Sequence, residues 1–466
     1  MQISLLPEIH LYEDMSYREK LIAILNSDLN FHSQNGNYAA HNFHAFPAKF
    51  PPQLPGEFIR HLTTTEDIVL DPMSGSGTSI LEACLEGRKA IGLDIDPLAI
   101  LLAKVKTTPL DKREVNRIGQ LILKNAVEAV TNSSDELQNL LDGRFDRRTK
   151  EFVAYWFAPE TQLELMALIS EIEKIDNPDI RDFFELIFSS LIITKSGGVS
   201  LALDLAHTRP HKVKVAISSS GAYLFGEELE SEIPLKKRRF SIKKLRSALS
   251  EFKKGFQVNY KNLLMSAQTI EIPHVSFGNA QHIPLADDSI DLIITSPPYA
   301  SNAIDYMRAH KFSLVWFGKS IGELSERRKE YIGAETTQNF RFEDLPLETD
   351  RIVEEVSALD RKKGLVLHRY YSEMTLVLKE MYRILKPGKA AVLVVGTSIL
   401  RGRDSETQNC LAEIGASLGF DVPGIGVRSL DRNRRMMPAG KKINYESQIQ
   451  QRMHQEYVIG FLKPKE

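Results

Sequence analysis

The stretch best suited to chemistry is residues 295–299, which read Thr295, Ser296, Pro297, Pro298 and Tyr299. It follows the apolar run 291–294, so it is predicted to be a loop leaving the carboxyl end of a buried strand. Two prolines fix the backbone and remove two N–H donors, which leaves the Ser296 and Pro297 carbonyl oxygens able to face a ligand. Beside the flat ring of Tyr299, such acceptors suit a planar ring with an exocyclic amino group, as in an extruded nucleobase. Taken alone, the five residues fit a plain proline turn equally well.

A second candidate site follows the short apolar strand 67–71, which ends in Asp71 and leads through a glycine turn into a helix. Gly75 and Gly77 permit positive φ and close backbone approach, and the helix N-terminus offers free N–H groups. The next apolar strand ends in Asp94, about twenty residues downstream, where an acid accepts hydrogen bonds from ribose hydroxyls. The pairing indicates a nucleoside-bearing cofactor. It is not the dinucleotide fingerprint, because Ile80 replaces the third glycine, and it is not a P-loop.

Length and composition set the frame for these two loops. The chain has 466 residues and a formal net charge of −2, so it is long enough for two or more domains with a sizeable core. Any contact with nucleic acid must come from local basic patches. Cys84 and Cys410 are far apart and lack metal-ligand spacing, which argues against a disulfide framework or a metal site and fits a reducing cytoplasm. We expect neither export nor membrane insertion.

Alternating strands and helices are predicted to position the two loops. Further apolar strands are expected at 275–280, 290–294, 390–396 and 457–462, with helices between them. Five or more such strands predict a doubly wound α/β sheet with ligands at the strand carboxyl ends. Residues 1–40 are predicted to be a lead-in of uncertain order, with a helical pattern at 17–25.

A long insertion, residues 108–270, interrupts this alternation and is mostly helical in pattern. It carries a basic run that can neutralise phosphates, and a second basic cluster follows near residue 432; a solvated helix face is the alternative. The mixed stretch 303–359 has no clear pattern, and a mobile lid is one interpretation. The candidate nucleic-acid-binding residues are Lys236, Lys237, Arg238, Arg239, Arg432 and Arg434.

Together these residues resemble the amino-group DNA methyltransferases that use S-adenosylmethionine. The loop after Asp71 is similar to the family's cofactor loop, with Met73 where phenylalanine is usual, and Asp94 falls at the ribose-binding acid. Residues 46–50 resemble the segment that closes over the methionine end, and Asn279 stands where an aspartate is common near the adenine ring. The resemblance implies cofactor contacts from Phe46, Lys49, Asp71, Pro72, Ser74, Gly75, Gly77, Thr78, Asp94 and Asn279.

The loop 295–299 is similar to the family's catalytic loop in its serine-proline-proline-tyrosine form, which goes more often with cytosine N4 than with adenine N6. The resemblance implies a class I methyltransferase sheet, with a catalytic domain at 41–107 and 271–466 and a target recognition region at 108–270. It implies site-specific methylation of double-stranded DNA, no metal and no membrane. It also implies a restriction-modification setting, in which a cognate restriction endonuclease would act separately.

The expected chemistry needs no strong base. If the Ser296 hydroxyl and the Pro297 carbonyl accept hydrogen bonds from the amine protons, the nitrogen can pyramidalise and aim its lone pair at the methyl. Pro298 would hold the loop, and Tyr299 would stack on the base. Three alternatives remain: an adenine-N6 enzyme, an RNA guanine-N2 or protein-glutamine methyltransferase, and a non-enzymatic nucleic-acid-binding protein on the same fold.

Overall fold

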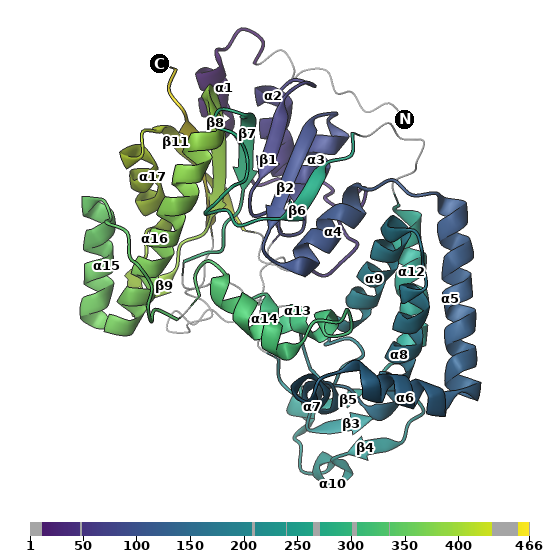
Figure 1. Cartoon of the computed structure of the whole chain (residues 1–466). Coiled ribbons are helices and arrows are strands. Elements are labelled where there is room, and N and C mark those ends of the chain that lie inside the picture. The colour runs from purple at the N-terminus through teal and green to yellow at the C-terminus, as the bar shows by residue number, and fades with distance from the viewer. Residues whose placement is uncertain are drawn as a thin grey trace.

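The structure is a computed structural model that describes residues 12–46, 49–206, 210–238, 240–263, 271–300, 305–334, 336–430 and 455–465. Figure 1 shows an α/β part built on one large sheet and a mostly helical part beside it. Helices α13 (Met307–Leu314) and α14 (Ile321–Arg327) lie between the two parts. The stretch 303–359, which has no clear pattern in the sequence, therefore contributes helices to the middle of the molecule.

The large sheet has seven strands in the order β11-β12-β8-β7-β1-β2-β6. Neighbouring strands from β8 to β6 run parallel, whereas β12 is antiparallel to both β8 and β11. This is the doubly wound α/β sheet predicted from the sequence. Its strands are β1 (Ile68–Asp71), β2 (Lys89–Asp94), β6 (His274–Phe277), β7 (Ile290–Thr295), β8 (Leu385–Val395), β11 (Asp421–Ser429) and β12 (Gln455–Leu462).

Both faces of the sheet are covered, which explains why its central strands are apolar without alternation. In β7, Leu292 and Ile294 belong to the core on one face and Ile293 to the core on the other. Helices α1 (Tyr17–Leu25), α2 (Gln53–Leu62), α3 (Thr78–Leu85) and α4 (Pro97–Thr107) cover the first face. Helices α15 (Leu347–Leu359), α16 (Arg361–Ile384) and α17 (Thr407–Ser417) cover the second.

The strand order reverses between β1 and β7. From β1 the chain adds β2 and β6 on one side, and it then returns to place β7 and β8 on the other side of β1. Connections that leave β1 and β7 therefore diverge, and a crevice opens at their carboxyl ends, where such sheets bind ligands. Asp71 ends β1 and Thr295 ends β7, so the topology brings the two candidate loops to this crevice.

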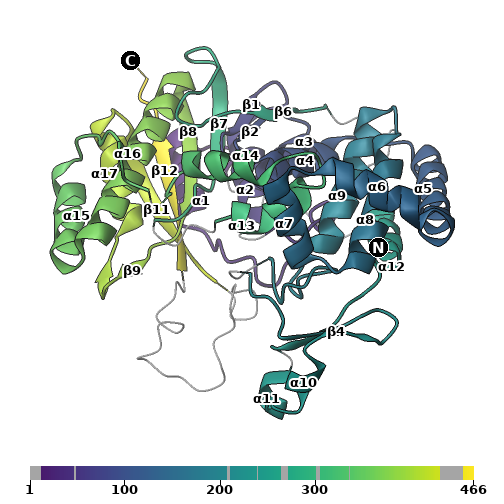
Figure 2. The same cartoon turned by 60° about the horizontal axis from the view of Figure 1, so that its bottom comes forward.

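The insertion consists of helices with a small sheet at one end (Figure 2). Its core is rich in aromatic side chains, and it continues into that of α4 and α13. The small sheet has the order β4-β3-β5, and a serine-rich segment, residues 218–221, lies between β3 and β4. The elements are α5 (Lys112–Asn132), α6 (Ser134–Arg144), α7 (Arg147–Trp156), α8 (Pro159–Glu173), α9 (Pro178–Ile192), β3 (Val215–Ile217), β4 (Tyr223–Phe225), α10 (Glu227–Glu230), α11 (Leu235–Arg238), β5 (Ile242–Lys244) and α12 (Ala248–Lys261).

Several strand boundaries differ from the sequence prediction. Strand β6 ends at Phe277 rather than at 280, and β12 begins at Gln455 rather than at 457. Strand β8 begins at Leu385 rather than near residue 390, and Gly388 within it donates its N–H to the carbonyl of Lys463 at 2.8 Å. Strand β11 was not predicted, because its sequence contains two glycines and a proline instead of an apolar run. It pairs with the antiparallel strand β12 at Asp421 and from Gly424 to Ser429, with an irregularity between. Long-range pairing thus decided what local pattern did not.

Two negative findings concern the described ranges alone. Within them no helix is both long and apolar enough to cross a membrane. The same residues contain no group of three or more His, Cys, Asp or Glu side chains placed to hold a metal ion.

Candidate active site

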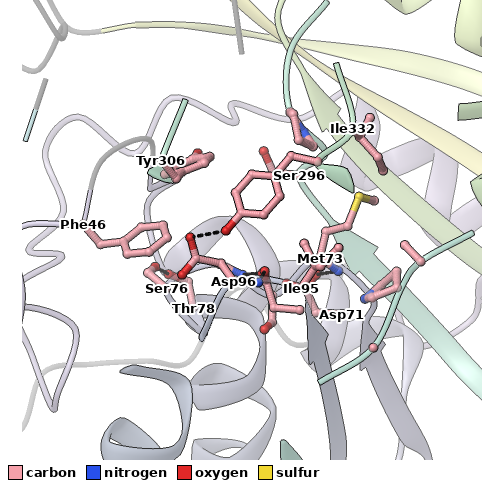
Figure 3. Close-up of a pocket in the computed structure, with 18 of the residues that line it drawn as sticks. Phe46, Asp71, Met73, Ser76, Thr78, Ile95, Asp96, Ser296, Tyr306 and Ile332 are labelled. Atoms are coloured by element: carbon pink, nitrogen blue, oxygen red, sulfur yellow. Dashed lines mark hydrogen bonds between the residues drawn. The ribbon is translucent and has the colours of Figure 1, made fainter. Parts of the chain in front are cut away.

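A cavity lies at the carboxyl ends of β1, β2, β6 and β7, with an empty volume of about 890 Å³ that includes open solvent (Figure 3). This is the position at which the sheet topology predicts a ligand. Most of the residues singled out from the sequence line it. They are Phe46, Lys49, Asp71, Pro72, Ser74, Gly75, Thr78, Asp94, Asn279, Ser296 and Pro298.

The glycine loop forms one wall of the cavity. It is tied to β2 because the Ser74 N–H donates to the Leu93 carbonyl at 2.9 Å. Gly75 has φ +48° and Gly77 has φ +71°, conformations that L side chains rarely adopt. Gly77 does not line the cavity: a Cβ there would lie 2.7 Å from the Cβ of Ala103 in α4. Gly77 therefore contributes to the predicted cofactor site only indirectly, because it permits the close approach of α3 and α4.

The two acids that end β1 and β2 lie beside the loop, with Asp71 buried and Asp94 partly buried. Asp94 accepts the Gly75 N–H at 2.7 Å on one oxygen and the Asp96 N–H at 2.8 Å on the other. Burial raises the pKa of Asp94 to about 7, and the neighbouring Asp96 carboxylate adds to the effect. Burial also raises the pKa of Asp71 to about 6. Each carboxylate oxygen of Asp94 retains a lone pair, so this side chain can accept further bonds from a ligand.

Phe46 and Lys49 approach the cavity from the segment that precedes α2, of which residues 47 and 48 lie outside the described ranges. The Phe46 ring stacks on Tyr306 with centroids 5.3 Å apart. The Lys49 ammonium donates to the backbone carbonyls of His41 at 3.1 Å and His44 at 2.8 Å. Burial lowers the pKa of Lys49 to about 8. These bonds leave one of the three ammonium hydrogens for a ligand.

Asn279 lines the cavity from the turn after β6. Its side-chain oxygen accepts the backbone N–H of Gln281 at 3.0 Å, which fixes the amide at the edge of the cavity. The side-chain NH₂ remains a donor, and the oxygen retains a second lone pair.

The loop after β7 forms the opposite wall. Ser296 and Pro298 line the cavity, whereas Pro297 and Tyr299 do not. Tyr299 packs against the core on the α16 side of the sheet, and its hydroxyl donates to the carboxylate of Glu456 at 2.9 Å. Burial, together with the Glu456 carboxylate, raises the pKa of Tyr299, so the hydroxyl stays protonated.

Glu456 is itself held by a buried ion pair. It lies directly opposite Arg428 in the antiparallel β11–β12 register, and the two side chains are only 11% and 7% exposed. Arg428 belongs to the second basic cluster of the sequence, yet in the structure it binds a carboxylate inside the protein. The pairing of β11 with β12 thus holds the carboxylate that binds Tyr299 in the loop after β7.

Several cavity residues had not been singled out from the sequence. Seven of them lie in or directly beside segments that were singled out: Phe50, Met73, Ser76, Ile95, Asp96, Gly278 and Ala280. The other four, Tyr306, Glu330, Tyr331 and Ile332, come from the stretch 305–334, which no local pattern could place. No signal in the sequence marks these four as neighbours of the glycine loop.

Three of the predicted basic residues lie within the described ranges, and none of these three lines the cavity. Lys236, Lys237 and Arg238 form part of α11, at the end of the insertion that carries the small sheet (Figure 2). Both lysines are exposed, while Arg238 lies 3.6 Å from Glu230. The remaining three predictions, Arg239, Arg432 and Arg434, lie outside the described residues.

Comparison with known proteins finds sequence similarity to DNA methyltransferases. A family model described as a DNA methylase matches residues 20–105. The Type II methyltransferase M.MvaI of Kocuria varians is 24% identical over 429 residues, covering 87% of this chain and 86% of the relative. M.BsoBI, a Type II methyltransferase of Geobacillus stearothermophilus, is 22% identical over 457 residues, covering 88% and 83%. A crystal structure of a methyltransferase described as SAM-dependent, from Methanosarcina mazei, covers 88% of this chain and 98% of its own, at 11% identity and a TM-score of 0.29.

The doubly wound sheet with its antiparallel strand β12, the glycine loop after β1 and the acid after β2 are those of a class I methyltransferase fold. The matching family model and the relatives that align over most of their length support assignment of the chain to the amino-group DNA methyltransferases. S-adenosylmethionine is accordingly its methyl donor and DNA its substrate.

Proposed function

We propose that this protein methylates the exocyclic N4 amine of cytosine at a specific site in double-stranded DNA. The observation that carries the proposal is that Ser296 lines the same cavity as Gly75 and Asp94. A methyl donor held by the glycine loop would therefore lie next to the group proposed to bind the target amine. The serine form of the loop favours cytosine over adenine.

The cofactor would lie along the β1–β2 wall. Asp94 has free lone pairs for the ribose hydroxyls, and Asn279 stands at the edge proposed for adenine. Phe46 and Lys49 would face the methionine end, where the remaining hydrogen of the Lys49 ammonium suits a carboxylate. The remaining contacts proposed on this wall are from Asp71, Pro72, Ser74, Gly75 and Thr78.

When bound, S-adenosylmethionine supplies an electrophilic methyl group. The lone pair of the target amine is delocalised into the ring, and the Ser296 hydroxyl would localise it by accepting an amine proton. The Pro297 carbonyl, the second acceptor proposed from the sequence, belongs to the same loop but lies outside the cavity lining. Transfer of that methyl group would form the new N–C bond and break the S–C bond, leaving the sulfur neutral. The amine would then lose one proton to water, so the chain need not supply a catalytic base.

DNA would be held by separate parts of the chain. We propose that Tyr299, kept in place by Glu456, stacks on the extruded base, and that Lys236, Lys237 and Arg238 contact phosphates. The insertion would then recognise the target sequence. Because the relatives are Type II methyltransferases, we also propose a cognate restriction endonuclease that acts separately.

The decisive experiment identifies the product. Methylated duplex DNA is digested to nucleosides and analysed by mass spectrometry, with the Ser296→Ala protein as the inactive control. We expect N4-methylcytosine. N6-methyladenine would establish the adenine enzyme instead, and methyl incorporation only into transfer RNA would refute DNA as the substrate.

A further inference from the structure

Residues 328–334 border the cavity, and we call them the strap. They begin with the short helix η2 (Arg328–Glu330) and continue through a turn, and Glu330, Tyr331 and Ile332 all line the cavity. The strap follows α14 and belongs to the stretch that the sequence left unassigned.

One end of the strap is tied to the cofactor wall. The Tyr331 hydroxyl donates to Asp96 at 2.9 Å. Asp96 is only 5% exposed at its side chain, and His310, which is 0% exposed, bonds to the same carboxylate oxygen at 2.6 Å. Tyr331 is therefore held on a buried, charged acceptor rather than left at the surface.

Asp96 has no capacity left for a ligand. Its second oxygen accepts the N–H groups of Leu98 at 2.8 Å and Ala99 at 3.4 Å, which caps α4. Four hydrogen bonds occupy about four acceptor positions of the carboxylate. The acid thus acts as a brace for Tyr331, unlike Asp94, two residues earlier, which keeps lone pairs free.

The other side of the strap is tied to α16 by a second buried charge. Arg369 and Glu373 form an ion pair with side chains 8% and 2% exposed. Glu373 accepts the Gly333 N–H at 2.8 Å, and Arg369 donates to the Lys329 carbonyl at 3.2 Å. A loop with hydrogen bonds to buried charges on both sides is a fixed wall, because opening it would leave those charges unpaired.

From this geometry we propose that the strap is a fixed roof of the cofactor site and that Tyr331, braced by Asp96, is a cofactor-positioning residue. Tyr331 bonds to Asp96, which follows Asp94 by two residues, and all three line the cavity, so its ring would cover the ribose end of the cofactor rather than the target base. The inference rests on the proposed assignment of this cavity to S-adenosylmethionine.

The test compares Tyr331→Phe and Tyr331→Ala with Lys329→Ala, a control on the same strap. The Lys329 side chain is 59% exposed, and its ammonium pairs only with Glu326 among the residues described. Binding of S-adenosylhomocysteine is measured by calorimetry, and initial rates are measured at varied cofactor and DNA. We expect affinity to fall about threefold to tenfold for Tyr331→Phe and about tenfold to a hundredfold for Tyr331→Ala. In both Tyr331 variants the KM for cofactor should rise, while kcat and the KM for DNA stay unchanged. Lys329→Ala should equal the wild type in all of these quantities.

Asp94→Asn separates failure of this inference from failure of the proposed function. If Asp94→Asn weakens binding but Tyr331→Phe equals wild type, the role of Tyr331 is refuted and the cavity assignment stands. If Asp94→Asn also binds normally, the assignment of the cavity itself fails. Tyr331→Phe keeps the ring and the shape, so it decides the matter even if Tyr331→Ala does not fold, and a fall in kcat alone would contradict a cofactor role.

Discussion

The two walls of the cavity are built in different ways. The β1–β2 wall is assembled from segments close in sequence, since Gly75 and Asp94 bond directly to each other. The β7 wall depends on distant residues: Tyr299 bonds to Glu456, and the Ala300 carbonyl accepts from Ser398 at 2.6 Å. The first wall is a local motif, whereas the second is a loop whose position is set by the far edge of the sheet.

This difference predicts that substitutions in the two walls have separate effects. Changes on the β1–β2 wall should alter cofactor affinity, and changes on the β7 wall should alter turnover with cofactor affinity intact. Four experiments test that separation.

The largest effect is expected at Ser296. Ser296→Ala removes one acceptor for the target amine, and turnover should fall about 100-fold or more, as for removal of one preorganised polar group in other active sites. Binding of S-adenosylhomocysteine, measured by calorimetry, should not change. A large loss of cofactor affinity would instead show that Ser296 is structural and that the two walls do not have separate effects.

Asp94→Asn should have the opposite signature. Replacing a charged acceptor by a neutral one weakens its hydrogen bonds, so cofactor affinity should fall about tenfold to a hundredfold. Turnover at saturating cofactor should change much less than with Ser296→Ala. Equal losses in both quantities would show that the walls are coupled.

Cofactor affinity should also depend on pH. Burial holds the pKa of Asp94 at about 7, above the ordinary value, so the carboxyl gains its proton as pH falls through 7 and then accepts ribose hydroxyls less well. Affinity should therefore drop by about tenfold from pH 8 to pH 6. Calorimetry across this range should show the drop in the wild type, and a flatter profile in Asp94→Asn.

The smallest effect on catalysis is expected at Glu456. Glu456→Gln retains an acceptor for the Tyr299 hydroxyl but removes the charge that pairs with Arg428, so turnover should fall a few-fold while stability falls by about 1–3 kcal/mol. Urea unfolding measures the stability change, and calorimetry should show normal cofactor binding. Tyr299→Phe serves as the partner variant, because it removes the same bond while leaving the ion pair. Loss of cofactor binding in Glu456→Gln would show that a change on the β7 wall also alters cofactor affinity, which contradicts the predicted separation.

Much of the β1–β2 wall was predictable because its determinants are short-range. Asp71, Gly75 and Asp94 follow strands whose apolar pattern is clear, and the parallel pairing of β1 with β2 places their ends together. Gly77 was recognised as special for the right conformational reason, its positive φ, but it packs against Ala103 and does not face the cavity.

The sequence by itself determined the doubly wound sheet, the two loops at its carboxyl edge and the class of cofactor, because apolar periodicity, glycines and prolines act within a few residues of chain. Only the tertiary structure decided that Tyr331 covers the cavity, that Asp96 braces it, and that Glu456 and Arg428 support Tyr299. The physical reason is that these contacts join residues separated by 157 to 235 positions, or pair across two strands at the sheet edge. Such contacts leave no periodic trace in the sequence.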